Sequence, residues 1–157
     1  MKKILVFSDS HGFMDNMRMV LCNETPDMMI HLGDCWEDAC KLHEEFPDIP
    51  LEQVPGNCDF QRGPFEKILI IEEKKILICH GHTYHVKSGY LNIEYSAKEK
   101  GVDAVLFGHT HQAFYNNHNG LVMLNPGSIG CSVLNPASYG YLTVGEEVLR
   151  ADVGFIE

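Results

Sequence analysis

The feature that most constrains this chain is the set of polar residues that directly follow its short apolar runs. In six places a strand-like run ends in Asp, His or Asn beside a glycine. These are 4–7 with Ser8-Asp9-Ser10-His11, 28–32 with Gly33-Asp34, 51–54 with Pro55-Gly56-Asn57-Cys58-Asp59, 76–79 with His80-Gly81-His82, 104–107 with Gly108-His109-Thr110-His111, and 121–124 with Asn125-Pro126-Gly127-Ser128. Ligands of α/β sheets bind beyond the carboxyl ends of the strands, and glycines let the backbone turn sharply there. We therefore expect these strand ends to converge on one polar site.

The remaining pattern indicates a single α/β domain over residues 1–157, because nothing in the sequence resembles a repeat or a linker. Further strand-like runs are 68–71 and 139–144, and hairpin turns are expected at 72–75, 117–120 and 145–147. Apolar spacing predicts three helices: one after Gly12, with Asp15 as a candidate cap, one over about 36–46, and one over about 88–100, with Ser88 as a candidate cap. Strand–helix–strand units followed by hairpins predict mixed strand pairing.

The net charge of the chain limits the classes of partner that it is expected to bind. Its 12 basic and 22 acidic residues give a formal net charge of -10, which argues against a long nucleic-acid track or an anionic membrane surface. The apolar N-terminal run is too short for a signal peptide, and no run is long enough to span a membrane, so we expect a cytoplasmic protein. The six cysteines form no CxxC pair and are expected to be free thiols.

The residue types at the strand ends are those of a metal site. Two aspartates, one asparagine and four histidines among them would supply oxygen and nitrogen donors. Such donors suit manganese, iron or zinc better than calcium. Seven residues are too many for one ion, so we expect two divalent ions, with manganese favoured and iron, nickel or zinc as alternatives.

The ordered motifs Asp-x-His, Gly-Asp, Gly-Asn-x-Asp, His and Gly-His-x-His resemble those of the calcineurin-like metallophosphoesterases. The chain is similar to the YfcE-type branch of small prokaryotic phosphodiesterases in its small size, in the motif Gly-Asn-Cys-Asp and in the later Asn-Pro-Gly-Ser. The resemblance implies a two-sheet β sandwich flanked by helices, in four αββα layers. It also implies that Asp9, His11 and His111 hold one ion, that Asn57, His80 and His109 hold the other, and that Asp34 bridges them.

The implied reaction is hydrolysis of a small phosphodiester, in which a hydroxide that bridges the two ions attacks phosphorus. Asn57, Cys58 and His82 are the candidate catalytic residues. Cys58 stands where many members of the superfamily have histidine, and a thiol with a pKa near 8.5 is a poorer acid for an alkoxide, which favours activated diesters. The proton for the leaving group comes from water, His82 or Cys58. After Ser128 the chain reads 129-IGCSV-133 in place of the Pro-Arg of related chains, so an arginine clamp for phosphate is missing.

Several alternatives stay open. The fold also serves in a retromer subunit as a non-catalytic interaction module, and phosphomonoesters are alternative substrates. His82 either supports the ligands or contacts the substrate, or else has a structural role. Asp59 either orients Asn57 or its loop, or else has a structural role. His31 is expected to be a hydrogen-bonded core histidine. The sequence is compatible with a homo-oligomer. The negative net charge does not exclude phosphate, because two bound ions make the pocket locally cationic, and it favours a small substrate over a polymer.

Overall fold

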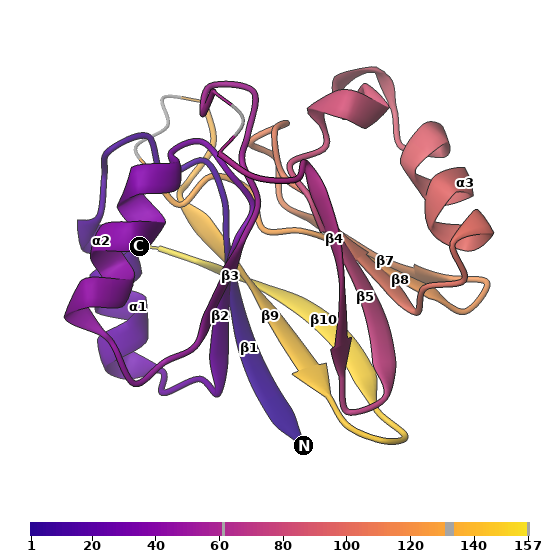
Figure 1. The fold of residues 1–157 in the computed structure, drawn as a ribbon, viewed down its shortest axis with the longest axis horizontal. Coiled ribbons are helices and arrows are strands. Elements are labelled where there is room, and N and C mark those ends of the chain that lie inside the picture. Colours follow the sequence, from indigo (N-terminus) through magenta and orange to yellow (C-terminus); the bar gives the residue numbers. More distant parts are fainter. Residues whose placement is uncertain (61, 131–133, 157) are drawn as a thin grey trace.

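The computed structural model describes residues 1–60, 62–130 and 134–156, which form two five-stranded sheets packed face to face (Figure 1). The first sheet has the order β10-β9-β1-β2-β3 and the second has the order β4-β5-β6-β8-β7. Strands of the first sheet are β1 (Lys2–Phe7), β2 (Met28–His31), β3 (Leu51–Gln53), β9 (Ser138–Val144) and β10 (Leu149–Phe155). Those of the second are β4 (Glu66–Ile71), β5 (Lys74–Cys79), β6 (Ala104–Leu106), β7 (Phe114–His118) and β8 (Leu121–Asn125).

Both sheets contain parallel and antiparallel pairs, as the sequence predicts. β1, β2 and β3 are parallel and are connected through α1 (Asp15–Asn23) and α2 (Trp36–Glu45). β5, β6 and β8 are parallel, and α3 (Leu91–Glu99) lies between β5 and β6 along the chain. The hairpins β4–β5, β7–β8 and β9–β10 are antiparallel. Their turns lie in the three segments where turn residues predicted them.

Apolar side chains fill three layers between and outside the sheets. The strand β1 is buried on both faces, because Ile4 and Val6 face the other sheet whereas Leu5 and Phe7 pack with α1 and α2. This explains why its apolar run is continuous rather than alternating. α3 covers the outer face of the second sheet, where Ile93 and Ala97 pack on Leu77 and Phe107. Figure 1 shows the resulting helix–sheet–sheet–helix arrangement, so the expected four-layer fold is confirmed.

The local differences from the sequence expectation lie mostly at helix starts. Asp15 does not cap α1 but is its first residue and pairs with Arg18 at 2.9 Å. Ser88 does not cap α3, because two short 3-10 turns, η1 (His82–Tyr84) and η2 (Val86–Ser88), precede Gly89 and delay the helix to Leu91. Around α1, Met14 and Met17 belong to the core, whereas Met19 is exposed.

Two strands, β7 and β10, carry no continuous apolar run. In the sequence, only the predicted hairpin turns indicate these two strands. In β7 every residue except Phe114 is exposed, and the sequence of the strand is therefore polar. No helix in the described part of the chain has the length and apolar character needed to cross a bilayer.

Candidate metal centre

The loops that follow β1, β2, β3, β5, β6 and β8 lie along one edge of the sandwich, at the top in Figure 1. Parallel strands of both sheets end at this edge, so each sheet delivers its polar strand ends there. The first sheet supplies Asp9, His11, Asp34 and Asn57, and the second supplies His80, His109 and His111. The structure therefore brings the predicted strand ends together, although their binding of metal stays a prediction.

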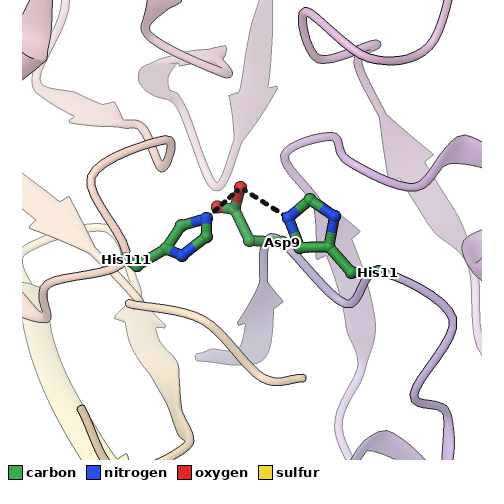
Figure 2. Close-up of side chains that lie close together, drawn as sticks. All are labelled: Asp9, His11 and His111. Atoms are coloured by element: carbon green, nitrogen blue, oxygen red, sulfur yellow. Dashed lines mark hydrogen bonds and ion pairs between the residues drawn. The ribbon is translucent and has the colours of Figure 1, made fainter. Parts of the chain in front are cut away.

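One group of donors consists of Asp9, His11 and His111, whose potential ligand atoms all lie within 4.8 Å of one another. Figure 2 shows the Asp9 carboxylate between the two imidazole rings. Its Oδ1 atom is 3.2 Å from Nε2 of His111 and 3.7 Å from Nε2 of His11. The other oxygen, Oδ2, accepts hydrogen bonds from the Ser8 hydroxyl at 2.5 Å and from the backbone N–H of His109 at 3.1 Å. The carboxylate is thus oriented with one oxygen toward the histidines.

A second group consists of Asp34, His80 and His109, again with ligand atoms within 4.8 Å of one another. Nε2 of His80 lies 3.4 Å from Oδ2 of Asp34 and 3.1 Å from Nδ1 of His109. Nδ1 of His80 is 2.8 Å from the carbonyl oxygen of Leu32, to which it donates its proton. In the neutral imidazole this hydrogen bond directs the Nε2 lone pair at the site, which is the arrangement typical of a metal-binding histidine.

The two groups adjoin at His80. Its Nε2 atom is 3.4 Å from Asp34 and 3.8 Å from Oδ1 of Asp9, so the same atom lies near both carboxylates. The donors are carboxylate oxygens and imidazole nitrogens, and neither group contains a thiolate. The residues present therefore fit a pair of divalent transition ions better than calcium.

Asn57, also a predicted ligand, is held near the second donor group by its loop rather than by a contact of its own side chain. Its side chain is exposed, and its amide nitrogen lies 3.5 Å from Sγ of Cys58. The backbone N–H of Cys58 donates to Oδ1 of Asp34 at 3.0 Å, which holds the loop that carries Asn57 against the second donor group. The position of the loop fits the prediction that Asn57 is a ligand.

The backbone at the site is strained at the proposed ligands. Asp9, His11, Asp34, His109 and His111 all have positive φ angles, of 56°, 47°, 47°, 72° and 62°. This left-handed region is uncommon for residues with a side chain, and such strain concentrates at functional sites. Gly33 and Gly56 pack directly against each other there, and a Cβ on Gly56 would overlap the Asp34 carboxylate. The fold thus stabilises a ligand geometry that the chain does not favour locally.

Asp59 holds two of the ligand loops together. Its Oδ2 atom accepts hydrogen bonds from the backbone N–H groups of Asp34 and Gly56, both at 2.8 Å, and Oδ1 accepts one from Trp36 at 2.9 Å. The side chain is buried. Of the two roles open from the sequence, the structure supports the one in which Asp59 orients the loops.

Ser10, His31 and Asp38 form a buried network under the first donor group. The Gly33 N–H donates to Nδ1 of His31 at 3.1 Å, so Nε2 carries the proton and donates to the Ser10 hydroxyl at 3.0 Å. Ser10 in turn donates to Oδ2 of Asp38 at 2.7 Å. His31 is thus the hydrogen-bonded core histidine that the sequence predicts. Ser10 and Asp38 were not predicted, because only tertiary packing brings α2 to this loop.

Because His31 is buried in this network, we expect the folded protein to lose stability in acid. Burial lowers the pKa of His31 to about 4, whereas an unfolded histidine titrates near 6.5. Between these values the unfolded chain binds a proton that the folded chain excludes, so stability falls as the pH falls, by up to about 3 kcal/mol at pH 4. Denaturant unfolding from pH 7 to 4 should show a smaller loss in His31→Gln than in the unchanged protein. Equal losses in the two proteins would contradict this role.

The electrostatics of the two donor groups are dominated by their carboxylates. Burial opposes ionisation of Asp9, but the neighbouring imidazoles of His11 and His111 hold its pKa well below the usual range. Burial likewise opposes ionisation of Asp34, and His80 nevertheless lowers its pKa to about 2. Burial and the neighbouring His80 lower the pKa of His109 to about 4. Two carboxylates and a neutral imidazole are therefore available to a cation at neutral pH.

The candidate catalytic residues Cys58 and His82 lie beside the second donor group. Desolvation and the negative charge of Asp34 raise the pKa of the exposed Cys58 thiol, which stays neutral at pH 7. The His82 ring centroid is 5.6 Å from that of His80 and 6.2 Å from that of His109, and burial lowers its pKa. Its Nδ1 atom is buried and accepts no hydrogen bond from the residues that the structure describes.

Ser128, after β8, supports the first donor group from below. Its hydroxyl donates to the backbone oxygen of Asp9 at 2.8 Å. This contact gives the Asn-Pro-Gly-Ser motif a structural role that sequence reasoning missed, because the pattern alone indicates only a turn. The departure from Pro-Arg at Cys131, Ser132 and Val133 lies outside the described residues. Of the other histidines, His43 is half-buried and His85 and His118 are exposed.

Comparison with known proteins agrees with this geometry. The model of the calcineurin-like phosphoesterase superfamily domain matches residues 1–147. The chain belongs to this superfamily. A probable metallophosphoesterase of Bacillus subtilis, YsnB, is 38% identical over 147 residues, which cover 90% of this chain and 83% of the relative. Phosphodiesterase YfcE of Escherichia coli strain K12 is 25% identical over 169 aligned positions, which cover 90% and 88%.

Solved structures share the same fold. A predicted phosphoesterase from Streptococcus pneumoniae superposes with a TM-score of 0.81 at 26% identity, over 98% of this chain and 89% of that one. Vacuolar protein sorting 29 from Cryptosporidium parvum superposes with a TM-score of 0.83 over 99% and 92% of the chains, but its identity of 18% shows the fold alone. The chain is therefore a member of a phosphoesterase superfamily whose fold also occurs in a protein named for vacuolar sorting.

Proposed function

We propose that this protein is a phosphodiesterase that hydrolyses small phosphodiesters with two divalent metal ions, manganese being the favoured ion. The observation that carries the proposal is the adjoining pair of donor groups, in which Nε2 of His80 lies 3.4 Å from Asp34 and 3.8 Å from Asp9. The phosphodiesterase name of the E. coli relative supports the choice of diesters.

In this proposal Asp9, His11 and His111 hold one ion, and Asn57, His80 and His109 hold the other. Asp34 would be shared by the two ions. Its Oδ2 lies 3.4 Å from Nε2 of His80, and its Oδ1 accepts a hydrogen bond from the Cys58 N–H at 3.0 Å. When bound, the ions would supply a hydroxide nucleophile near neutral pH and neutralise the charge that develops on the phosphoryl oxygens. The protein supplies the fixed orientation of the donors, through Leu32, Ser8 and Asp59.

The residues beside the second donor group favour an easily displaced leaving group. The Cys58 thiol is a weak acid with a raised pKa, and His82, whose pKa is lowered, is neutral at pH 7. Neither is a strong proton donor to an alkoxide. We therefore propose that Asn57 orients the substrate, that His82 or Cys58 provides only modest protonation, and that activated diesters react faster than monoesters. The five described cysteines are free thiols, which fits action in the reducing cytoplasm.

A comparison of the hydrolysis rates of a diester and a monoester tests the reaction class. With Mn²⁺ present, bis(4-nitrophenyl) phosphate is expected to be hydrolysed at least about tenfold faster than 4-nitrophenyl phosphate, measured as kcat/KM at pH 7.5. The two compounds share a leaving group, so the ratio reports the preference for diesters. A larger rate on the monoester would replace the proposal with a phosphomonoesterase.

Metal uptake tests the site independently of turnover. After chelation and dialysis, the protein is expected to take up two Mn²⁺ per chain, measured by elemental analysis. At an ion concentration of 100 times Kd, each occupied site should stabilise the fold by about 2.7 kcal/mol, seen as a rise in Tm. A chain that takes up no divalent ion would instead favour an interaction module.

A further inference from the structure

A cavity of about 470 Å³ lies beside the proposed metal centre. It is lined by Val86, Lys87, Gly89, Tyr90, Thr110 and Gln112. A volume of this size is typical of small-ligand pockets. Its residues come from η2, from the segment before α3 and from the loop after β6.

Two segments that line the cavity are connected to the segments that carry proposed ligands. Thr110 stands between the proposed ligands His109 and His111 in the chain. The Val86 N–H, from another part of the lining, donates to the carbonyl of Gly81, the residue that separates His80 from His82. A Cβ on Gly81 would lie 2.9 Å from a Val86 methyl carbon, so the two segments are in close contact. A substrate whose phosphorus is at the metal centre can therefore extend one arm into the cavity.

Lys87 gives this cavity a positive charge. Its side chain is exposed and forms no ion pair with the residues that the structure describes. By contrast, Arg62 pairs with Glu37, Lys98 with Glu94 and Lys100 with Glu66. Lys87 also lies close enough to His109 for its charge to lower the pKa of that imidazole. In a chain of net charge -10, an unpaired lysine at this position is available to an anion.

The remaining walls are polar and fixed. The Thr110 hydroxyl accepts a hydrogen bond from Asn125 at 2.8 Å and another from the Gln112 N–H at 3.1 Å. The Tyr90 ring packs against Phe107 and Phe114, with centroid distances of 4.8 and 4.9 Å. These contacts fix the positions of Thr110 and Tyr90 in the lining of the cavity.

We propose that this cavity binds a second anionic group, a phosphate on one arm of the diester, and that Lys87 is the residue that contacts it. The proposal rests on the proposed function, and it narrows the substrate class to diesters in which one alcohol carries a further phosphate. Lys87 would thereby hold an anion in the absence of an arginine soon after Ser128 in the sequence.

The test compares diesters that share a 4-nitrophenyl leaving group and differ in the other arm. The unmodified protein with Mn²⁺ is expected to prefer a phosphoalkyl arm of two to four carbons over a plain alkyl arm by about tenfold in kcat/KM. In Lys87→Gln this preference should vanish, while the rate on the plain alkyl diester changes less than about twofold. Lys87→Arg should restore the preference, and Lys41→Gln, on the exposed face of α2, should leave it intact.

A binding measurement separates this proposal from the reaction itself. By calorimetry, the Mn²⁺-loaded protein should bind propane-1,3-diyl bisphosphate about tenfold more tightly than propyl phosphate, and Lys87→Gln should bind both equally. A preference that is absent, or that survives in Lys87→Gln, overturns the anion site whether or not the diesters are hydrolysed. Hydrolysis of the plain diester without any such preference would leave the proposed function standing. Failure to hydrolyse any diester, with the bisphosphate preference retained, would instead remove the proposed function and keep the anion site.

Discussion

Replacing Asp34 or His109 by Ala is expected to lower kcat/KM for an activated phosphodiester by more than about 100-fold. Loss of a residue that only orients a ligand already costs about 10- to 100-fold in metal affinity or activity, so loss of a bridging or direct ligand should exceed that range. Asp34 and His109 belong to the same donor group, whose ligand atoms lie within 4.8 Å of one another. Steady-state rates on bis(4-nitrophenyl) phosphate with Mn²⁺ measure the loss, and elemental analysis measures the metal retained.

Two matched variants control for the loss of a carboxylate or an imidazole as such, because they remove these groups outside the donor groups. Asp152→Ala and His118→Ala alter exposed residues of β10 and β7 that lie outside both donor groups. They should keep both activity and metal content. If Asp34→Ala and His109→Ala were as active as the unchanged protein, the metal-dependent mechanism would be wrong.

Replacing Asp59 by Ala is expected to destabilise the fold by about 3 kcal/mol and to weaken metal binding by about 10- to 100-fold. The substitution leaves the buried N–H groups of Asp34 and Gly56, and that of Trp36, without their acceptor. The loops that hold Asp34 and Asn57 would then lose their common anchor, although no proposed ligand is altered. Denaturant unfolding measures the first effect and Mn²⁺ titration the second.

Asp48→Ala provides the comparison, because Asp48 is an exposed aspartate just before β3. Its removal should change stability by less than about 0.5 kcal/mol and leave metal affinity unaltered. A loss of stability in Asp59→Ala without any change in metal affinity would show that Asp59 supports the fold alone.

The architecture and the position of the site followed from the sequence where the signal is local. Each of the six strand ends carries its apolar run and its polar residues within a few positions, so the polar edge of the sheets could be predicted from the six taken together. The family resemblance then provided the pairing of ligands and the two-sheet arrangement.

The remaining features depend on contacts between distant segments. Asp38 looks like an ordinary acidic residue in the first turn of α2, and only the fold brings it to Ser10 and Gly12, 2.7 Å from each. Lys87 likewise carries no sequence signal, because its role depends on the approach of η2 to the loop after β6. The polar strand β7 is stabilised by its antiparallel pairing with β8 rather than by buried side chains.

Each sheet contributes only part of the donor set, and this division has a consequence for how the protein acquires its ions. Asp9 and His11 follow β1 of one sheet, whereas His111, their partner in the same group, follows β6 of the other. Asp34 is separated in the same way from His80 and His109. Neither half of the sandwich alone presents a complete group, so tight metal capture requires that the two halves have already docked. If the proposed ions bind, each would cross-link the two layers, and the affinity of the protein for metal would measure how completely its halves have assembled.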